Sequence, residues 1–91
     1  MRTAVYFEGR RAGSLDWRQE PGGVRAVLDC ELCSACILRV YAETEGAAPL
    51  YVGLPEPQGG RLRLARRLSA ETLRQAGWTG KEPLRVYLAE R

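Results

Sequence analysis

The chain has 91 residues, of which 45% are hydrophobic and 27% are charged, as is typical of one folded domain rather than of a disordered chain. It contains no histidine, which excludes Ser-His-Asp and Cys-His catalysis within this chain and removes the commonest metal ligand. The net charge of +3 is low for a dedicated nucleic-acid-binding protein, and every basic residue except Lys81 is arginine.

The first segment with structural character is a short apolar run, residues 4–7, which ends at Glu8. This run is shorter than the apolar core of a signal peptide. No run in the chain approaches the ~20 apolar residues of a membrane span. A cytoplasmic location is therefore expected, and the odd number of cysteines, three, favours reduced thiols over a disulfide framework.

Turn signals rich in glycine and proline recur at short intervals, at residues 9–10, 20–23, 46–49, 55–60 and 80–83. The segments between them alternate between apolar and polar residues, which is typical of half-buried strands. We predict strands at residues 3–7, 12–17, 24–30, 36–43, 50–54 and 84–89. Gly9 can supply the positive φ that a tight hairpin after the first strand requires.

The alternation also assigns side chains to the two faces of these strands. In the last two strands it places six residues inward: Leu50, Val52, Leu54, Leu84, Val86 and Leu88. Trp17 continues the inward row of Leu15 and is expected in the core, where an indole buries up to ~250 Å². Trp78 follows the expected end of a helix and is predicted to anchor that helix to the sheet.

Residues 61–76 fit two structures. Residues 61–64 alternate as a strand does, whereas Leu62, Ala65, Leu68 and Leu73 also lie at helical spacing. We favour a strand to about residue 67 and then two helical turns, with a single helix over residues 61–76 as the alternative. Ser69 is a favourable N-cap for the short helix, and Gly77 is a favourable residue to end it.

These elements predict a single mainly β domain spanning residues 1–91. Its expected architecture is a small antiparallel β-sandwich or partly open barrel of six to seven strands, with one short α-helix before the last strand. Residues 84–89 are the expected edge strand, which would allow a homo-oligomer by strand pairing. The spacing of residues 37–41, 50–55 and 61–68 resembles small uncharacterised bacterial proteins, a resemblance that implies no function.

Cys30, Cys33 and Cys36 form a C-x2-C-x2-C cluster. Such spacing is typical of zinc and iron–sulfur ligands, but a fourth cysteine or a histidine is missing, so a carboxylate or another subunit would have to complete the shell. The last two cysteines also form a CxxC redox motif. The simpler interpretation, which we favour, is that these cysteines are small apolar residues of the strands and their turn.

The outward rows of the expected strands combine arginine and tyrosine: Arg25, Arg39, Tyr41, Tyr51, Arg61, Arg63, Arg85 and Tyr87. A sheet face of this composition could hold single-stranded nucleic acid, with arginines on phosphates and rings stacked on bases. Cross-strand Arg–Tyr and Arg–Glu pairs also stabilise an ordinary exposed face. Asp29 and Glu43 share this face and would repel phosphate.

No motif points to catalysis, to a cofactor or to an acid–base pair. We therefore expect a non-catalytic protein–protein interaction or structural module, whose partner is another protein or a second copy of the chain. Single-stranded nucleic-acid binding and a metal or redox role for the cysteines are the two alternatives.

Overall fold

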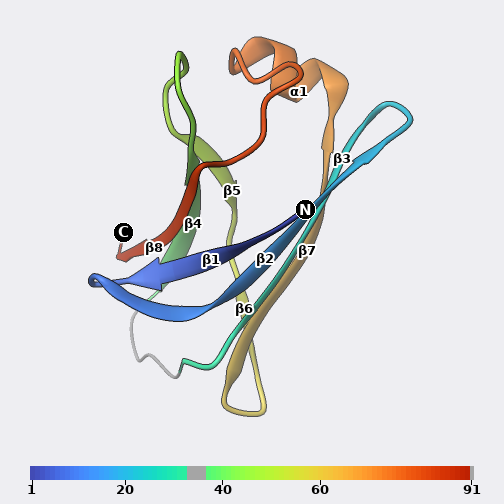
Figure 1. Ribbon diagram of the computed structural model, residues 1–91. Coiled ribbons are helices and arrows are strands. Elements are labelled where there is room, and N and C mark those ends of the chain that lie inside the picture. Colours follow the sequence, from blue (N-terminus) through green and yellow to red (C-terminus); the bar gives the residue numbers. More distant parts are fainter. Residues whose placement is uncertain (33–36, 91) are drawn as a thin grey trace.

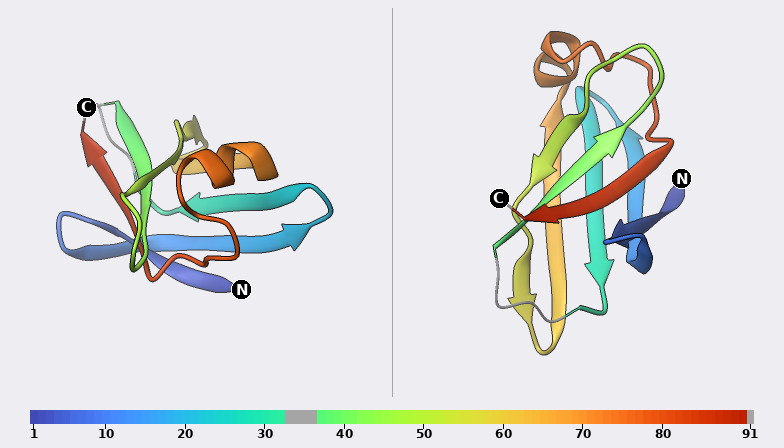
Figure 2. Two further views of the ribbon diagram at one scale, coloured as in Figure 1. Left: turned by 90° about the horizontal axis from the view of Figure 1, so that it is seen from above. Right: turned by 90° about the vertical axis from the view of Figure 1, so that its left-hand side faces the viewer.

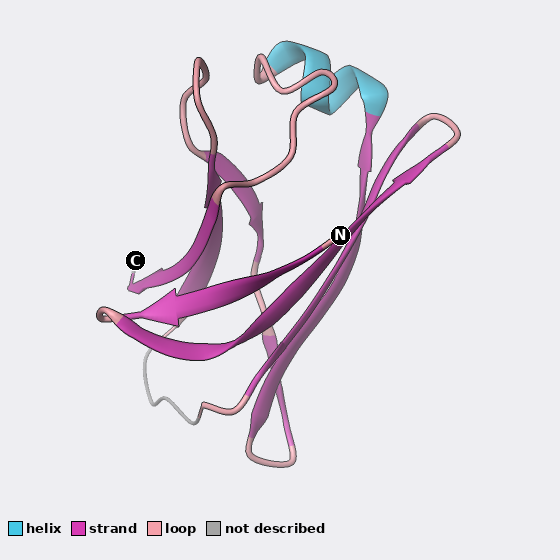
Figure 3. Cartoon of the chain, viewed as in Figure 1, coloured by secondary structure: helices cyan, strands magenta, loops and turns pink. Residues whose placement is uncertain are grey.

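The computed structural model describes residues 1–32 and 37–90. The described residues form eight strands and one short helix (Figures 1 and 3). In chain order these are β1 (Arg2–Phe7), β2 (Arg10–Glu20), β3 (Gly23–Cys30), β4 (Leu38–Glu43), β5 (Leu50–Gly53), β6 (Glu56–Gln58), β7 (Arg61–Ser69), α1 (Ala70–Gln75) and β8 (Arg85–Glu90). The mainly β prediction with a short helix before the last strand is confirmed.

The strands form one open sheet in the order β5-β4-β8-β1-β2-β3-β7-β6. The sheet curls into a half-barrel, so that β4, β5 and β8 face β3 and β7 across the interior (Figure 2). β1 and β2 lie between these two groups of strands. The expectation of a partly open barrel is therefore correct, with eight strands rather than six or seven, because β6 lies within what the sequence indicated to be a loop.

The prediction that residues 84–89 form an edge strand is wrong. β8 lies inside the sheet, where it pairs with β4 on one side and with β1 on the other. The pairing with β1 is parallel and aligns Val5 with Val86, whereas the other six strand pairings are antiparallel. The edges of the sheet are β5 and β6.

The hairpin between β1 and β2 has the two-residue loop that the sequence predicts. Phe7 pairs with Arg10 across the turn, and the two central residues have positive φ, 51° at Glu8 and 79° at Gly9. Positive φ at both positions is the geometry of a type I′ turn, whose twist matches that of the flanking strands. Gly9 adopts this conformation without strain, and Glu8 does not.

The core lies on the concave side of the curled sheet. It is built from the inward row of every long strand, with Leu15, Leu28, Val40 and Val86 among its buried residues. Two inward assignments from the sequence are wrong: Leu84 is 67% exposed and Leu54 is 49% exposed. Both residues lie just outside their strands, β8 and β5, so the alternation of the strand does not extend to them.

Helix α1 closes one end of the half-barrel (Figure 1). Ser69 is its N-cap and accepts a hydrogen bond from the backbone N–H of Thr72 at 3.1 Å, and Gly77 follows its end with a φ of 76°, as the sequence predicts. Trp78 then turns back into the core, where its ring centroid lies 5.8 Å from that of Trp17. Both indoles are buried, which confirms their predicted roles.

None of the helices in the described part of the chain is long and apolar enough to cross a membrane.

The two halves of the sheet approach each other between β5 and β7. A Cβ atom at Gly53 would lie 2.9 Å from Leu64 Cδ2, so a larger residue at this position would require the Leu64 side chain to move. Next to this contact, Arg66 Nη1 donates a hydrogen bond of 2.9 Å to the backbone carbonyl of Val52. We call the contacts of Arg66 and Gly53 across β5 and β7 the seam.

Candidate interaction surface

Of the three cysteines, only Cys30 lies within the described residues, and Cys33 and Cys36 lie outside them. Cys30 continues the inward row of β3 and is fully buried. Burial, with a smaller contribution from Asp29, raises the pKa of its thiol to about 11, so it is protonated at neutral pH. Within residues 1–32 and 37–90, no three Cys, Asp or Glu side chains are grouped in a way that could hold a metal ion.

The eight arginine and tyrosine residues predicted to share one outward face are divided between two faces. Arg39, Tyr41, Tyr51, Arg85 and Tyr87 lie on β4, β5 and β8. Arg25, Arg61 and Arg63 lie on β3 and β7, on the other half of the curled sheet. The curl of the sheet separates these two groups, and the alternation of a sequence contains no information about curl.

The first face carries all four tyrosines of the chain in one row. Tyr6 is aligned with Tyr87 across β1 and β8, Tyr87 with Tyr41 across β8 and β4, and Tyr41 with Tyr51 across β4 and β5. Each tyrosine alternates with buried residues of its strand, so the rings point outward from the half-barrel. We call these four residues the tyrosine row.

The inner rings of the tyrosine row contact each other, and the outer rings are the more exposed. The ring of Tyr41 stacks on that of Tyr87 with centroids 5.7 Å apart and is tilted against Tyr51 at the same distance. Tyr51 is 42% exposed and Tyr6 is 37% exposed. Such mutual packing holds the rings in place, as cross-strand aromatic pairs do.

Two arginines cover the tyrosine row. The guanidinium of Arg85 lies 5.3 Å from the ring centroid of Tyr87, and that of Arg66, reaching out of the seam, lies 6.0 Å from that of Tyr51. Both distances suit a cation–π contact. Burial, with a smaller contribution from Glu43, raises the pKa of the Tyr87 hydroxyl.

The second face is dominated by ion pairs within the chain. Arg61 donates to Asp29 at 2.8 Å and to Glu31 at 3.0 Å, and Arg63 lies 3.6 Å from the same Asp29 carboxylate. The hydrogen bond from Arg61 is the main reason why the pKa of Asp29 is lowered. Two of the arginines predicted to bind nucleic acid are therefore already paired with carboxylates.

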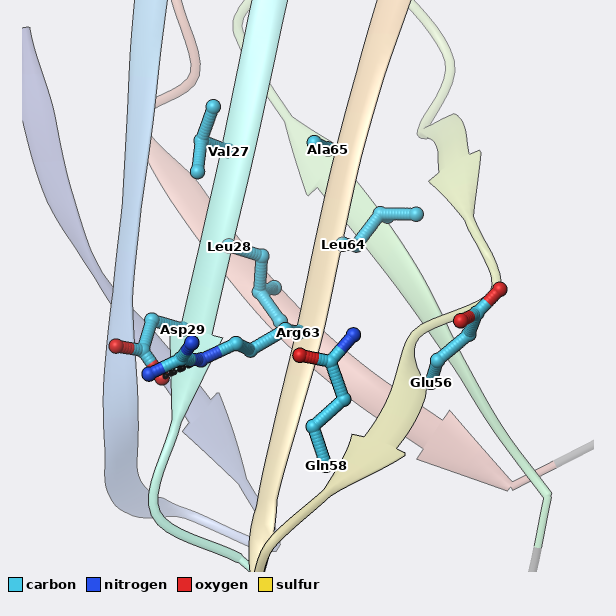
Figure 4. Close-up of a pocket in the computed structure, with 8 residues that line it drawn as sticks. All are labelled: Val27, Leu28, Asp29, Glu56, Gln58, Arg63, Leu64 and Ala65. Atoms are coloured by element: carbon cyan, nitrogen blue, oxygen red, sulfur yellow. Dashed lines mark ion pairs between the residues drawn. The ribbon is translucent and has the colours of Figure 1, made fainter.

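A shallow hollow lies on this second face, over β3, β7 and β6 (Figure 4). Figure 4 shows the Arg63 side chain reaching over β3 to Asp29, with Glu56 and Gln58 of β6 on the opposite side. Val27 and Ala65 form an apolar part of its floor. Arg63 and Asp29 face each other and Glu56 lies apart from them, so the hollow lacks the converging polar groups of a small-molecule site.

The sequence analysis missed one member of the tyrosine row, Tyr6. Its strand is a continuous apolar run, so the sequence did not show which of its residues face outward. The alternation of the buried Val5 with the exposed Tyr6 is visible only in the structure.

No protein-family model, no curated protein and no solved structure matches this chain. The function proposed below is therefore argued from the residues and geometry of the chain itself.

Proposed function

We propose that this chain is a non-catalytic protein–protein interaction module and that the tyrosine row is its binding surface. The observation that carries the proposal is the alignment of all four tyrosines of the chain across four adjacent strands. Tyrosine and arginine are the residues, with tryptophan, that most often dominate binding energy at protein interfaces. Tyrosine rings give a large apolar contact area at low cost in side-chain entropy, and tyrosine hydroxyls can still form hydrogen bonds.

The surroundings of the row support a protein partner over a nucleic acid. Arg85 lies 3.5 Å from Glu43, and Arg66 is hydrogen bonded to Val52. Of the arginines near the row, Arg39 and Arg11, which is aligned with Tyr6, form no ion pair or hydrogen bond within the described residues. Two cations without partners are few for phosphate-driven binding, which gains its affinity from several neutralised phosphates.

Site-specific photocrosslinking in the native cells tests the proposal. A benzoylphenylalanine at position 51, in the exposed end of the row, is expected to give one discrete protein adduct. The same probe at Ala65, an exposed position on the second face, is the matched control and is expected to give none. An additional Tyr6→Ala change should reduce the adduct at position 51 about tenfold or more, because a partner that spans the row loses an anchor ring.

Some outcomes of these experiments would contradict the proposal. Equal crosslinking from positions 51 and 65, or no effect of Tyr6→Ala, would show that the row is not the interface. Oligonucleotide binding that weakens steeply with salt and is lost in Arg39→Gln would replace it with the nucleic-acid alternative. Circular dichroism of each variant checks that the fold is retained.

A further inference from the structure

Three arginines lie directly opposite one another on the outer face of β2, β3 and β7. Arg18 pairs in register with Arg25, and Arg25 pairs in register with Arg67. Like charges in directly opposite positions destabilise a sheet. A local conflict of this kind is more often found at functional sites than elsewhere.

The outer two of these arginines have partners and the middle one does not. Arg18 donates to Asp16 at 3.0 Å, and Arg67 donates to the carbonyl of Pro21 at 2.7 Å and lies 3.6 Å from Glu20. Arg25 is exposed and forms no hydrogen bond or ion pair within the described residues. Its positive charge, between two others, is the one that the chain leaves uncompensated.

Arg25 lines a hollow over β1, β2 and β3 together with Arg2, Arg18 and the hydroxyl-bearing Ser14. Arg2, like Arg25, has no ion pair or hydrogen bond within residues 1–32 and 37–90.

Two carboxylates, those of Asp16 and Asp29, also line the hollow. Asp16 is paired within the hollow, with Arg18, and also lies 3.8 Å from the N-terminal ammonium, whereas Asp29 is paired with Arg61 and Arg63 outside it. The uncompensated charge of the hollow is therefore positive.

We propose that this hollow binds a phosphate group, held by Arg25 and Arg2 with Arg18 beside them. The phosphate is inorganic phosphate or the terminal phosphate of a small monoester, because both present the same dianion with several oxygen acceptors. Planar guanidinium groups on different strands suit such an acceptor, since each can donate two parallel hydrogen bonds. The bound dianion also removes the repulsion between Arg25 and its neighbours. This proposal is independent of the tyrosine row.

An NMR titration with inorganic phosphate, against sodium chloride at equal ionic strength, tests it. Phosphate is expected to shift the amide signals of β2 and β3 around Ser14, Arg18 and Arg25, together with the Arg25 Nε–H signal. Arg25→Gln should weaken phosphate binding about tenfold or more, the loss expected from one charged hydrogen-bonding group. Arg39→Gln, a partly exposed arginine on the other face, is the matched control and should bind phosphate as the parent chain does.

A melting curve separates loss of binding from loss of folding. Without phosphate, Arg25→Gln should melt no lower than the parent chain, because it removes like-charge repulsion. With phosphate, the parent chain should gain stability and the variant should not. Equal phosphate affinity in the two proteins, or shifts confined to other strands, would overturn the proposal.

A third arm distinguishes the two sources of phosphate. Glycerol 3-phosphate that binds more tightly than inorganic phosphate identifies a monoester as the ligand, and weaker binding identifies the free ion. Both results support the site. A response to a thymidine oligonucleotide with none to inorganic phosphate would contradict it.

Discussion

The two tryptophans of the core are both buried and lie side by side, but they differ in their hydrogen bonds. Trp78 Nε1 donates to the carbonyl of Ala48 at 3.0 Å. Trp17 Nε1 is buried and has no acceptor within the described residues. A buried donor without a partner costs about 1–3 kcal/mol.

The pair gives a prediction about stability. Trp17→Phe and Trp78→Phe both remove volume from the core, but only Trp78→Phe breaks a hydrogen bond and leaves the Ala48 carbonyl without its donor. We expect Trp78→Phe to lower the free energy of unfolding by about 1 kcal/mol more than Trp17→Phe. Urea unfolding at constant m-value measures the difference. If the two variants lose equal stability, or if Trp17→Phe loses more, the removed ring volume and not the hydrogen bond determines the loss.

At the residue scale, the sequence predicts which side chains are buried better than it predicts their hydrogen-bond and ion-pair partners. Alternation along β3 is enough to place Cys30 in the core, because its neighbours on the inward row are apolar. The pairing of Arg61 with Asp29 joins residues far apart in the chain, and no local pattern indicates it. This is why the sequence could not show that two of the arginines predicted to bind nucleic acid pair with a carboxylate of the chain.

At the element scale, the hairpin between β1 and β2 contains one residue that does not suit its turn. Glu8 has a positive φ, which costs a residue with a Cβ atom about 1–2 kcal/mol, whereas asparagine tolerates it better. Glu8→Asn should therefore raise the free energy of unfolding by about 0.5–1 kcal/mol, measured by thermal or urea unfolding.

Glu8→Gln is the control for this prediction. It removes the same charge and keeps a side chain that disfavours positive φ, so it should leave stability nearly unchanged. If the two variants stabilise the chain equally, the effect comes from charge rather than from the backbone.

The helix and the long strands could be predicted because the residues that mark their ends lie next to them in the sequence. The caps Ser69 and Gly77 delimit α1, and alternation with turn residues delimits the long strands. Strand β6 was missed because three residues, one of them Pro57, are too few for a pattern. Leu84 was misplaced because the turn before β8 ends only at that residue, where its N–H donates to the carbonyl of Glu43.

At the scale of the whole molecule, the seam holds the edge strand β5 against β7. Arg66→Met keeps most of the side chain but removes the hydrogen bond to Val52. We expect the local stability of β5 to fall by about 0.5–1.5 kcal/mol. Amide hydrogen exchange measures this loss: exchange in β5 should be faster in the variant than in the parent chain, whereas exchange in β2 and β3 should be unchanged. Arg39→Met, on β4 beside the edge strand β5, is the matched control. A uniform rise in exchange over the sheet would show that Arg66 acts on global stability instead.

The order of the strands could not be derived from the sequence. Alternation shows which residues face inward but not which strand lies beside which, because pairing is set by contacts between distant segments. The position of β8 between β1 and β4, the parallel pairing and the division of the arginines between two faces all follow from that order. The tyrosine row follows from it too, since its members come from β1, β4, β5 and β8, of which only β4 and β5 are consecutive in the chain.

The pairing of Val5 with Val86 makes the sheet depend on its latest strand. During synthesis β1 and β4 are both complete before β8 leaves the ribosome, and the strand that joins them in the sheet is missing until then. Contacts between such distant segments form slowly. Tyr87, in β8, is the ring that joins Tyr6 to Tyr41, so a growing chain without β8 carries the other three tyrosines but not the row. A partner that binds all four rings would distinguish the finished protein from its nascent forms.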